Sequence, residues 1–503
     1  MASLKKLAGQ TLWYGLSNIG ARFLNYILTP IVTYILHTKS QQAQYGDYSV
    51  LMASIAFINV IYTYGMETAY FRFSVAGPDR GKLFQTTFTS LLITTILLSL
   101  GFIASRESID AFLGLNGHPE YITWCVLIIA TDTMAAIPFA RLRQEERPRK
   151  YAFTKVAGIV VNIVLTVFFI SYSPGWVQSH PGTAYASWYA QYNSTGFLIM
   201  ALLAQSIFTF LLLWREWGSY RFGFDKALWA KIMAYTWPMV VVGLGGMVNE
   251  TIDRIMLRKL LPGGEEVAKV AVAVYSANYK LAIFITLFIQ AFKMSAEPFF
   301  FSQSADKNAP KTYARVMKWF VITLCLAFLF TSLYLDLWKY FVGNGAYWGG
   351  LGVVPILLAA NLCLGIYYNL SVWYKITDKM YIGMLITLVG AVITLLLNFA
   401  FIPAYGMYAC AWATLAAYGT MMVISYVWGQ KYFPVPYPVK KLTSYIVSML
   451  ILFFVEKGVQ YITHIVIIRL ITATGLMFLF LYLVFSVEKK ELKGMPLIGK
   501  YIK

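Results

Sequence analysis

Residues 381–402 read YIGMLITLVGAVITLLLNFAFI, a continuous apolar run that contains no charged side chain. Hydrocarbon offers no hydrogen-bond partners to an exposed backbone, and about 20 apolar residues in a helix cross the core of a bilayer. The run therefore predicts a membrane-spanning helix. Because it does not alternate between apolar and polar residues, it is unlike the strands of a membrane β-barrel.

The rest of the chain repeats this pattern. Of its 503 residues, 59% are hydrophobic and only 13% are charged, which is more apolar surface than one soluble core buries. The first apolar run is too long for a signal peptide and has no cleavage site, so we count it as a span. Apolar windows predict fourteen helices, at residues 11–37, 47–74, 84–104, 120–140, 151–171, 194–214, 230–256, 270–296, 316–335, 350–374, 381–402, 406–430, 441–455 and 464–486. We therefore expect an all-α polytopic membrane protein without a sizeable soluble domain.

The basic residues predict the orientation of these helices. Most of the 41 Lys and Arg residues fall on alternate connections and in the C-terminal tail, and short loops rich in Lys and Arg stay in the cytoplasm. Both termini are therefore expected inside. The net charge of +19 follows the inner face of the membrane, where anionic lipids lie, and does not indicate a nucleic-acid partner.

No pattern of catalytic or metal-binding residues is found. The longest predicted outer loop, 172–193, contains no Asp, Glu, Lys or Arg, whereas an enzyme that polymerises or ligates glycans there needs acid–base or cationic residues. Four cysteines lie inside predicted helices at spacings that match no metal or redox motif; they are Cys125, Cys325, Cys363 and Cys410. We expect a protein without catalytic residues, metal or cofactor.

Twelve ionisable residues fall inside the predicted spans or, in the case of Glu297, directly at the end of one, where each costs a few kcal/mol unless it is paired, hydrated or functional. The cations are Arg22, Arg72, Lys155, Arg254, Lys280, Lys293 and Arg469, and the acids are Glu67, Asp132, Glu250, Asp253 and Glu297. The excess of cations suits an anionic substrate such as a diphosphate, which Arg binds in bidentate fashion and Lys as a point charge.

Six polar residues are candidates for contact with such a substrate. Asn18, Arg22 and Asn25 recur at helical spacing near mid-membrane, so they either brace neighbouring helices or line a hydrated cavity, and the mid-depth position favours the cavity. Lys280 has no acid at a helical offset and is grouped with Arg22. Arg72 and Lys155, near the inner ends of their helices, either reach the headgroups or form the mouth of the cavity.

Four acids are candidates for ion coupling. Glu250 and Arg254 are spaced for an intrahelical pair, and Asp253 adds a second carboxylate, so this cluster is either a neutralised structural group or a cation or proton site. Glu67 and Asp132 have no local partner. Each either titrates or pairs across helices with Arg72 or Lys155.

Two stretches resemble a known family. Tyr45-Gly46-Asp47-Tyr48, Tyr64-Gly65-Met66-Glu67 and Arg72-Phe73 resemble the second-helix region of Wzx-type polysaccharide-biosynthesis flippases. The stretches Asp253–Leu257, Val274–Lys280, Gln290–Phe292 and Glu297–Phe299 are similar to the start of that family's second lobe. A weak internal repeat of Tyr48-Ser49 at Tyr275-Ser276 agrees with two related lobes.

The helix count is similar to that of the wider superfamily, which includes multidrug and toxin extruders and lipid II flippases. This resemblance implies two six-helix lobes around a central cavity, at 1–225 and 226–435, with two further helices and a basic tail at 436–503. It also implies a monomer, since one chain contains both lobes.

The function implied is a flippase that moves an undecaprenyl-diphosphate-linked glycan from the inner to the outer leaflet of a bacterial inner membrane by alternating access. A Na⁺ or H⁺ gradient acting on Glu67, Asp132, Glu250 or Asp253 is the candidate driving force. Expected partners are this lipid-linked oligosaccharide, membrane lipids, and the polysaccharide polymerase and assembly machinery of O-antigen or lipopolysaccharide. The alternatives are a cation-coupled multidrug exporter on the same fold, a membrane glycan polymerase or glycosyltransferase, and a scaffold without transport; the cationic interior disfavours the first.

Overall fold

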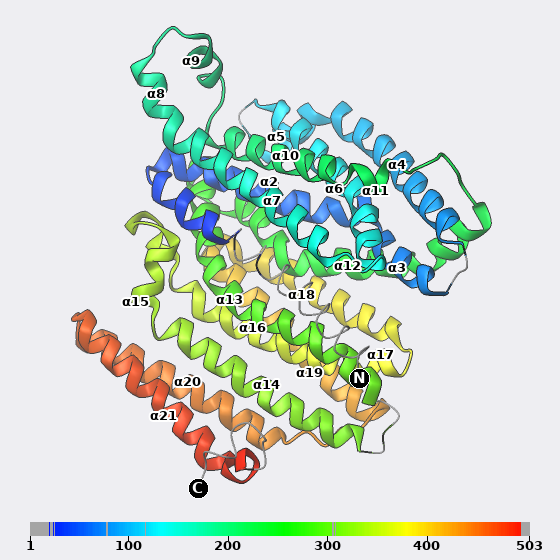
Figure 1. The fold of residues 1–503 in the computed structure, drawn as a ribbon. Coiled ribbons are helices and arrows are strands. Elements are labelled where there is room, and N and C mark those ends of the chain that lie inside the picture. Colours follow the sequence, from blue (N-terminus) through cyan, green and yellow to red (C-terminus); the bar gives the residue numbers. More distant parts are fainter. Residues whose placement is uncertain are drawn as a thin grey trace. The chain divides into compact units, whose positions relative to one another are not determined.

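The computed structural model describes residues 26–493 except 77–78, 116, 304–305 and 307, together with Gly20 and Leu24 (Figure 1). All regular structure in this part of the chain is helical. Thirteen of its helical segments are long and apolar enough to cross a membrane. The predicted first helix, 11–37, lies largely outside the described residues, but Tyr26–Ile35 forms an apolar helix. The prediction of an all-α multi-pass membrane protein is thus confirmed.

Most observed helices overlap the predicted ones and extend them by a few residues. In the first half of the chain they are α2 (Lys39–Thr63), α3 (Met66–Ala76), α4 (Arg80–Ala104), α5 (Arg106–Leu113), α6 (Pro119–Gln144), α7 (Pro148–Val167), α8 (Ser173–Ser179), α9 (Ala184–Tyr189), α10 (Ser194–Leu212), α11 (Trp214–Trp217) and α12 (Lys226–Leu260). In the second half they are α13 (Glu265–Gln303), α14 (Ala309–Ser332), α15 (Leu335–Trp338), α16 (Val353–Leu370), α17 (Val372–Ile376), α18 (Met380–Tyr405), α19 (Met407–Tyr432), α20 (Val439–Ile462) and α21 (Val466–Lys493).

Three details differ from the sequence-based expectation. The predicted helix 47–74 is divided into α2 and α3, because Tyr64 and Gly65 adopt left-handed backbone angles with φ of 31° and 73°. The predicted outer loop 172–193 contains α8 and α9. The segment predicted as a short helix at 441–455 is the full-length α20.

The chain divides into two compact units, which we describe separately. The first contains the described residues up to Ala277, with Gly343–Gly349 and Gly383–Ala417. In it, α6 packs against α2, α3, α4 and α10, and α12 packs against α2. A core that includes Met66, Tyr70 and Ile137 joins α3, α4 and α6, so the ends of these three helices are held in fixed register.

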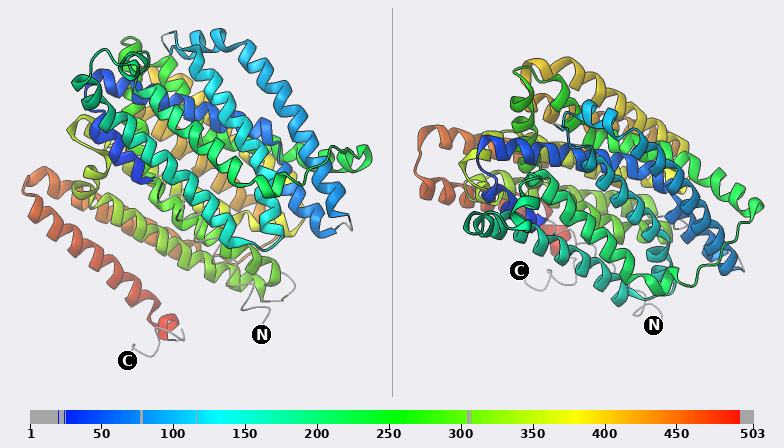
Figure 2. Two further views of the ribbon diagram at one scale, coloured as in Figure 1. Left: turned by 45° about the horizontal axis from the view of Figure 1, so that its top comes forward. Right: turned by 90° about the horizontal axis from the view of Figure 1, so that it is seen from above.

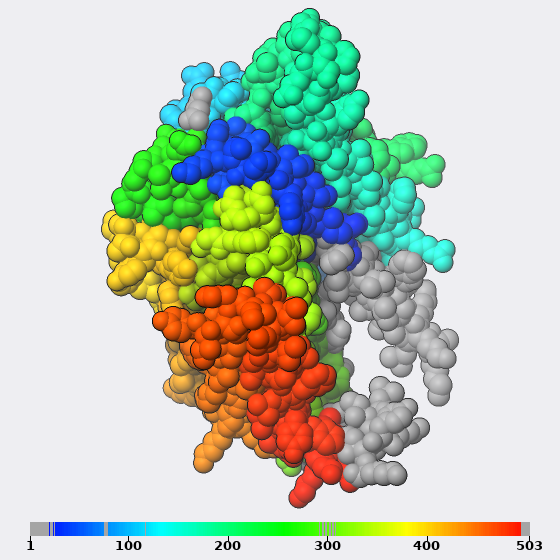
Figure 3. Space-filling model, turned by 90° about the vertical axis from the view of Figure 1, so that its left-hand side faces the viewer, coloured from blue at the N-terminus to red at the C-terminus, as the bar shows by residue number. Residues whose placement is uncertain are grey.

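The second unit contains residues 278–342, 350–382 and the described residues from Tyr418 onward. Here α14 packs against α16 and α20, and α20 and α21 form an antiparallel hairpin (Figures 1 and 2). Glu488 of α21 joins three helices, because it accepts from Lys318 of α14 at 2.5 Å and from Tyr445 of α20 at 2.7 Å. Figure 3 shows the surface of this hairpin; its exposed side chains include Phe454 and Ile471, as expected for a face in contact with lipid. The predicted lobe boundaries at residues 225 and 435 stay a prediction.

Candidate functional site

Asn18, Arg22 and Asn25 lie outside the described residues. The polar stripe that they were expected to form therefore stays a prediction. The other predicted site residues are described, and they lie in several separate places.

A buried ionic network joins α2, α12 and α13 of the first unit. Asp47 lies 3.1 Å from Lys269 Nζ and 3.5 Å from Arg258 Nη2. Glu265 lies 2.7 Å from Arg258 and 3.2 Å from Lys269. The side chains of Asp47, Arg258 and Lys269 are all buried, so each charge depends on these partners because water cannot solvate it.

Glycine at position 46 permits this network. A Cβ there would lie 2.0 Å from the carbonyl oxygen of Lys269, so only glycine lets α2 and α13 approach this closely. Arg258 is fixed further by donating to the carbonyl oxygens of Glu265 at 2.7 Å and Gly114 at 2.9 Å. Asp47, Arg258 and Lys269 were not among the predicted site residues, although the motif Tyr45-Gly46-Asp47-Tyr48 was noted.

A second buried acid lies on α12. Asp253 accepts a hydrogen bond from the Tyr275 hydroxyl at 2.5 Å, and its other oxygen lies 3.0 Å from Arg254 Nη1. Arg254 also donates to the backbone carbonyl of Glu250 at 2.7 Å. The predicted side-chain pair of Glu250 with Arg254 is corrected accordingly: the carboxylate that Arg254 contacts is that of Asp253, and Glu250 is exposed.

Polar groups one turn away from Asp253 tie α12 to α18. The Asn249 amide donates to the carbonyl of Thr387 at 3.3 Å and accepts from Thr394 at 2.9 Å. Asn249 and both threonines are buried. Asp253 is therefore held in a polar seam within the apolar part of the first unit.

The two acids without local partners have different surroundings. Glu67 of α3 forms an ion pair with Arg143 of α6, rather than with Arg72, whose guanidinium lies 4.2 Å from the centre of the Tyr235 ring. Asp132 of α6 is exposed, and Lys155 of α7 lies 5.0 Å from the centre of the Phe139 ring. The pairing expected of Asp132 with Lys155 stays a prediction.

Three further interior residues belong to the second unit. Lys280 is half-buried on α13, and Lys293 lies 4.8 Å from the centre of the Tyr368 ring. Arg469 forms an ion pair with Asp336 at 2.5 Å.

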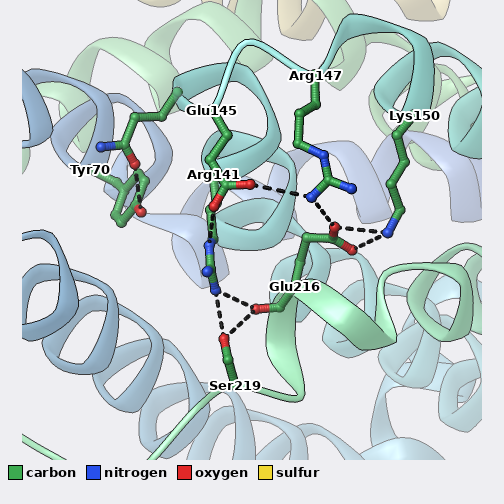
Figure 4. A network of polar contacts seen from close by, with 8 residues as sticks. Tyr70, Arg141, Glu145, Arg147, Lys150, Glu216 and Ser219 are labelled. Atoms are coloured by element: carbon green, nitrogen blue, oxygen red, sulfur yellow. Dashed lines mark hydrogen bonds and ion pairs between the residues drawn. The ribbon is translucent and has the colours of Figure 1, made fainter.

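The end of α6, the start of α7 and the residues between them, together called the basic loop (residues 141–150), form an ordered network with α11 (Figure 4). Glu216, whose side chain is 1% exposed, accepts from Arg147 at 3.0 Å and from Lys150 at 2.7 Å. Arg141 donates to Glu145 at 2.7 Å and to Ser219 at 2.7 Å. For basic residues of this kind the sequence predicted only a role in the orientation of the helices and in contact with lipid. In the structure, Arg141, Arg147 and Lys150 also hold this end of the first unit together.

Glu145 lies just beyond the membrane-spanning part of α6. Partial burial disfavours its charged form, but the hydrogen bonds and charges of Arg141 and Arg147 outweigh burial and lower its pKa below the ordinary value of 4.5. The carboxylate is therefore ionised at neutral pH.

No group of three or more His, Cys, Asp or Glu residues suited to a metal ion occurs in the part of the chain that the structure describes. The site is thus one of buried ion pairs and hydrogen bonds.

Comparison with known proteins gives a family and a fold. The family model described as "Polysaccharide biosynthesis protein" matches residues 7–304. None of the curated proteins matches the chain significantly.

Among solved structures, the chain is similar to the lipid II flippase MurJ in an inward closed conformation, with a TM-score of 0.71, 12% identity, and coverage of 94% of this chain and 98% of that chain. It is also similar to a multidrug resistance MATE family transporter of the MOP superfamily in two conformations. The inward-facing structure has a TM-score of 0.57, 12% identity and coverage of 84% and 94%; the outward-facing one has a TM-score of 0.56, 13% identity and coverage of 85% and 95%. At these identities the matches show the fold.

Proposed function

Because the chain belongs to the polysaccharide biosynthesis protein family, we propose that it is a flippase that moves a lipid-linked glycan across a bacterial inner membrane. The substrate is an undecaprenyl-diphosphate-linked oligosaccharide, carried from the cytoplasmic to the outer leaflet by alternating access. No covalent chemistry is involved. The name of one fold neighbour, lipid II flippase, supports a lipid-linked substrate.

The observation that carries this proposal is the set of buried charges in the segments that match the family. Asp47, Asp253, Arg258 and Lys269 are buried within membrane-spanning helices, and all four lie inside residues 7–304. Buried charges in a bilayer are retained where a protein uses them. If these ion pairs differ between two conformations, a ligand binds one conformation more tightly than the other. Transport requires this difference in affinity.

Within this proposal, Asp253 is the coupling group. Its carboxylate is held by Tyr275 and Arg254, so a proton or Na⁺ competes directly with these partners. The ion reaches Asp253 by way of three other carboxylates, which are those of Glu250, Glu67 and Asp132. A cation that binds Asp253 in one state only shifts the balance between the two states.

The substrate contacts in this proposal are cationic and amide side chains. Arg22 and Lys280 hold the diphosphate and Asn18 and Asn25 hydrogen-bond it, while Arg72 and Lys155 attract it at the cytoplasmic mouth. The chain acts as a monomer with both termini in the cytoplasm, and the polysaccharide polymerase takes the product on the outer side.

The first test is deletion of the gene followed by extraction of lipid-linked precursors. We expect loss of surface polysaccharide and accumulation of the precursor in the inner leaflet. Unchanged polysaccharide with retention of cationic dyes would instead establish the rival, a cation-coupled multidrug exporter, which the MATE neighbours favour.

The residue roles are tested by complementation of that deletion. Arg22→Ala with Lys280→Ala should abolish export, and full activity of the double variant would refute their role. Asp253→Asn, reconstituted in liposomes, should lose its response to an imposed Na⁺ or H⁺ gradient. Glu107→Gln, an exposed acid at the start of α5, is the matched control.

A further inference from the structure

A cavity of about 420 Å³ opens at the end of the first unit where the basic loop lies. It is enclosed by α3, α4, α6 and the segment after α11, and none of its lining residues takes part in the proposed transport. The lining residues that matter here are Tyr70, Arg80, Phe84, Arg141, Gln144 and Glu145. This volume lies within the range of small-molecule sites.

The first reason to assign a ligand is the pair of arginines in the wall. Arg141 has a fixed position, because it donates to the Glu216 carbonyl at 3.0 Å and to Ser219 at 2.7 Å (Figure 4) and lies 5.1 Å from the centre of the Phe84 ring. Arg80 is exposed at the first turn of α4. A helix start adds partial positive charge to the charge of Arg80.

The second reason is a buried donor that has no acceptor. Tyr70 donates its hydroxyl proton to Gln144 Oε1 at 2.9 Å, which fixes the orientation of the Gln144 amide. The Nε2 atom of Gln144 is buried, and no described residue accepts a hydrogen bond from it. A buried donor left in this state is costly, so a ligand that offers an acceptor oxygen is favoured at this position.

The third reason is the charge balance of the cavity. Glu145 is the one carboxylate among the described lining residues, and both its oxygens are engaged, Oε1 by Arg141 at 2.7 Å and Oε2 by Arg147 at 3.3 Å. Arg80, Arg141 and Gln144 thus line a cavity whose acid is already neutralised. An anion with several acceptor oxygens satisfies this arrangement, whereas a cation has no free carboxylate to bind.

We propose that this cavity binds a phosphate group, held by Arg80, Arg141 and Gln144, at the membrane face rich in Lys and Arg. The positive-inside rule places this face in the cytoplasm, where anionic phospholipid headgroups lie. The source is either such a headgroup or a free phosphate. The site is separate from the transported substrate and does not depend on the proposed function.

The test measures binding to the purified full-length protein in detergent. Thermal stability is followed while short-chain phosphatidylglycerol, phosphatidylcholine or inorganic phosphate is added. We expect phosphatidylglycerol to raise Tm more than phosphatidylcholine does. A similar rise with inorganic phosphate alone assigns the site to the free anion, and its absence assigns the site to the lipid headgroup.

Three variants that each lower the net charge by one identify the site. Arg80→Gln removes a cation from the wall, and Gln144→Glu keeps the acceptor for Tyr70 while it replaces the Nε2 donor with an anionic oxygen. Lys82→Gln removes an exposed cation two residues from Arg80; Lys82 does not line the cavity and pairs with Asp79 at 3.8 Å.

We expect Arg80→Gln to weaken binding by roughly fivefold to tenfold, because one charge-assisted hydrogen bond is lost at a partly exposed site. Gln144→Glu should weaken it at least as much, and Lys82→Gln should have no effect. Gel filtration and the Tm without ligand check that each variant is folded. Equal losses in Arg80→Gln and Lys82→Gln, or no dependence on any of the three, would overturn the proposal, because binding would then reflect general surface charge.

Discussion

Replacing Gly46 by Ala should separate α2 from α13. The added Cβ would lie 2.0 Å from the carbonyl oxygen of Lys269 and 2.8 Å from its carbonyl carbon. These are backbone atoms, so no side-chain rotation relieves the contact. Ordinary contact begins at 3.4 Å, and the two helices must therefore move apart by about 1.4 Å, the difference between the two distances.

This movement also affects the adjoining ion pair. Asp47 follows Gly46 directly, and its carboxylate lies 3.1 Å from Lys269 Nζ. Overpacking costs about 1–3 kcal/mol, and a broken buried pair costs about 3–5 kcal/mol. Since a shift of this size weakens the pair without removing it, we expect Gly46→Ala to lose about 2–4 kcal/mol of unfolding free energy.

Thermal unfolding of the purified protein in detergent measures this loss. Gly101→Ala is the matched control, because it makes the same change within the exposed part of α4, where nothing lies within 4 Å of the new Cβ. Its Tm should stay equal or rise slightly, since Ala favours a helix over Gly by about 0.5–1 kcal/mol. If the two variants had the same Tm as the wild-type chain, the close approach of α2 and α13 would be refuted.

Three further predictions concern the polar groups. Tyr275→Phe removes the hydroxyl that donates to buried Asp253 and should cost about 1–3 kcal/mol, whereas Tyr405→Phe, at an exposed ring, should leave Tm unchanged. The lowered pKa of Glu145 stabilises the folded state fully above pH 4.5 and loses this effect as pH falls through the folded pKa. The difference in Tm between the wild-type chain and Glu145→Gln should accordingly shrink below pH 4.5, and a constant difference would contradict this. Glu216→Leu leaves two partly exposed cations without their buried carboxylate and should cost about 1–3 kcal/mol in denaturant unfolding; an unchanged midpoint would show that the network is dispensable.

The membrane spans could be predicted because each apolar run is long and uninterrupted. Residues 381–402 became α18 (Met380–Tyr405) with almost no change in boundaries. The division of α2 from α3 could not be predicted in this way. Tyr64 and Gly65 lie in an apolar stretch, and its hydropathy does not indicate the left-handed conformation that both residues adopt.

The buried network of Asp47, Arg258 and Lys269 was missed because of errors of a few residues in helix boundaries. These three residues lay at or just beyond the predicted ends of 47–74, 230–256 and 270–296, where charges are usually solvated. In the structure the helices begin earlier or end later, at Lys39, Leu260 and Glu265. The three charges are consequently inside the spans.

The surroundings of Asp253 were predicted in part. Its place in a charged cluster followed from local spacing, which relates residues one helical turn apart. Tyr275 is 22 residues away on another helix, and no periodicity within one helix indicates such a partner. The same limit applies to Glu67 and Arg143, which are 76 residues apart.

The break at Tyr64 and Gly65 also has a consequence for the order of synthesis. A Cβ at Gly65 would lie 3.4 Å from Met239 Cβ and 3.7 Å from Thr236 Cβ, so α12 covers the break. These residues emerge about 170 positions later, which corresponds to roughly 10–30 seconds at the usual rates of translation. During that interval α2 and α3 are in the membrane without the helix that covers their bend. The packing around this bend is therefore complete only when α12 arrives.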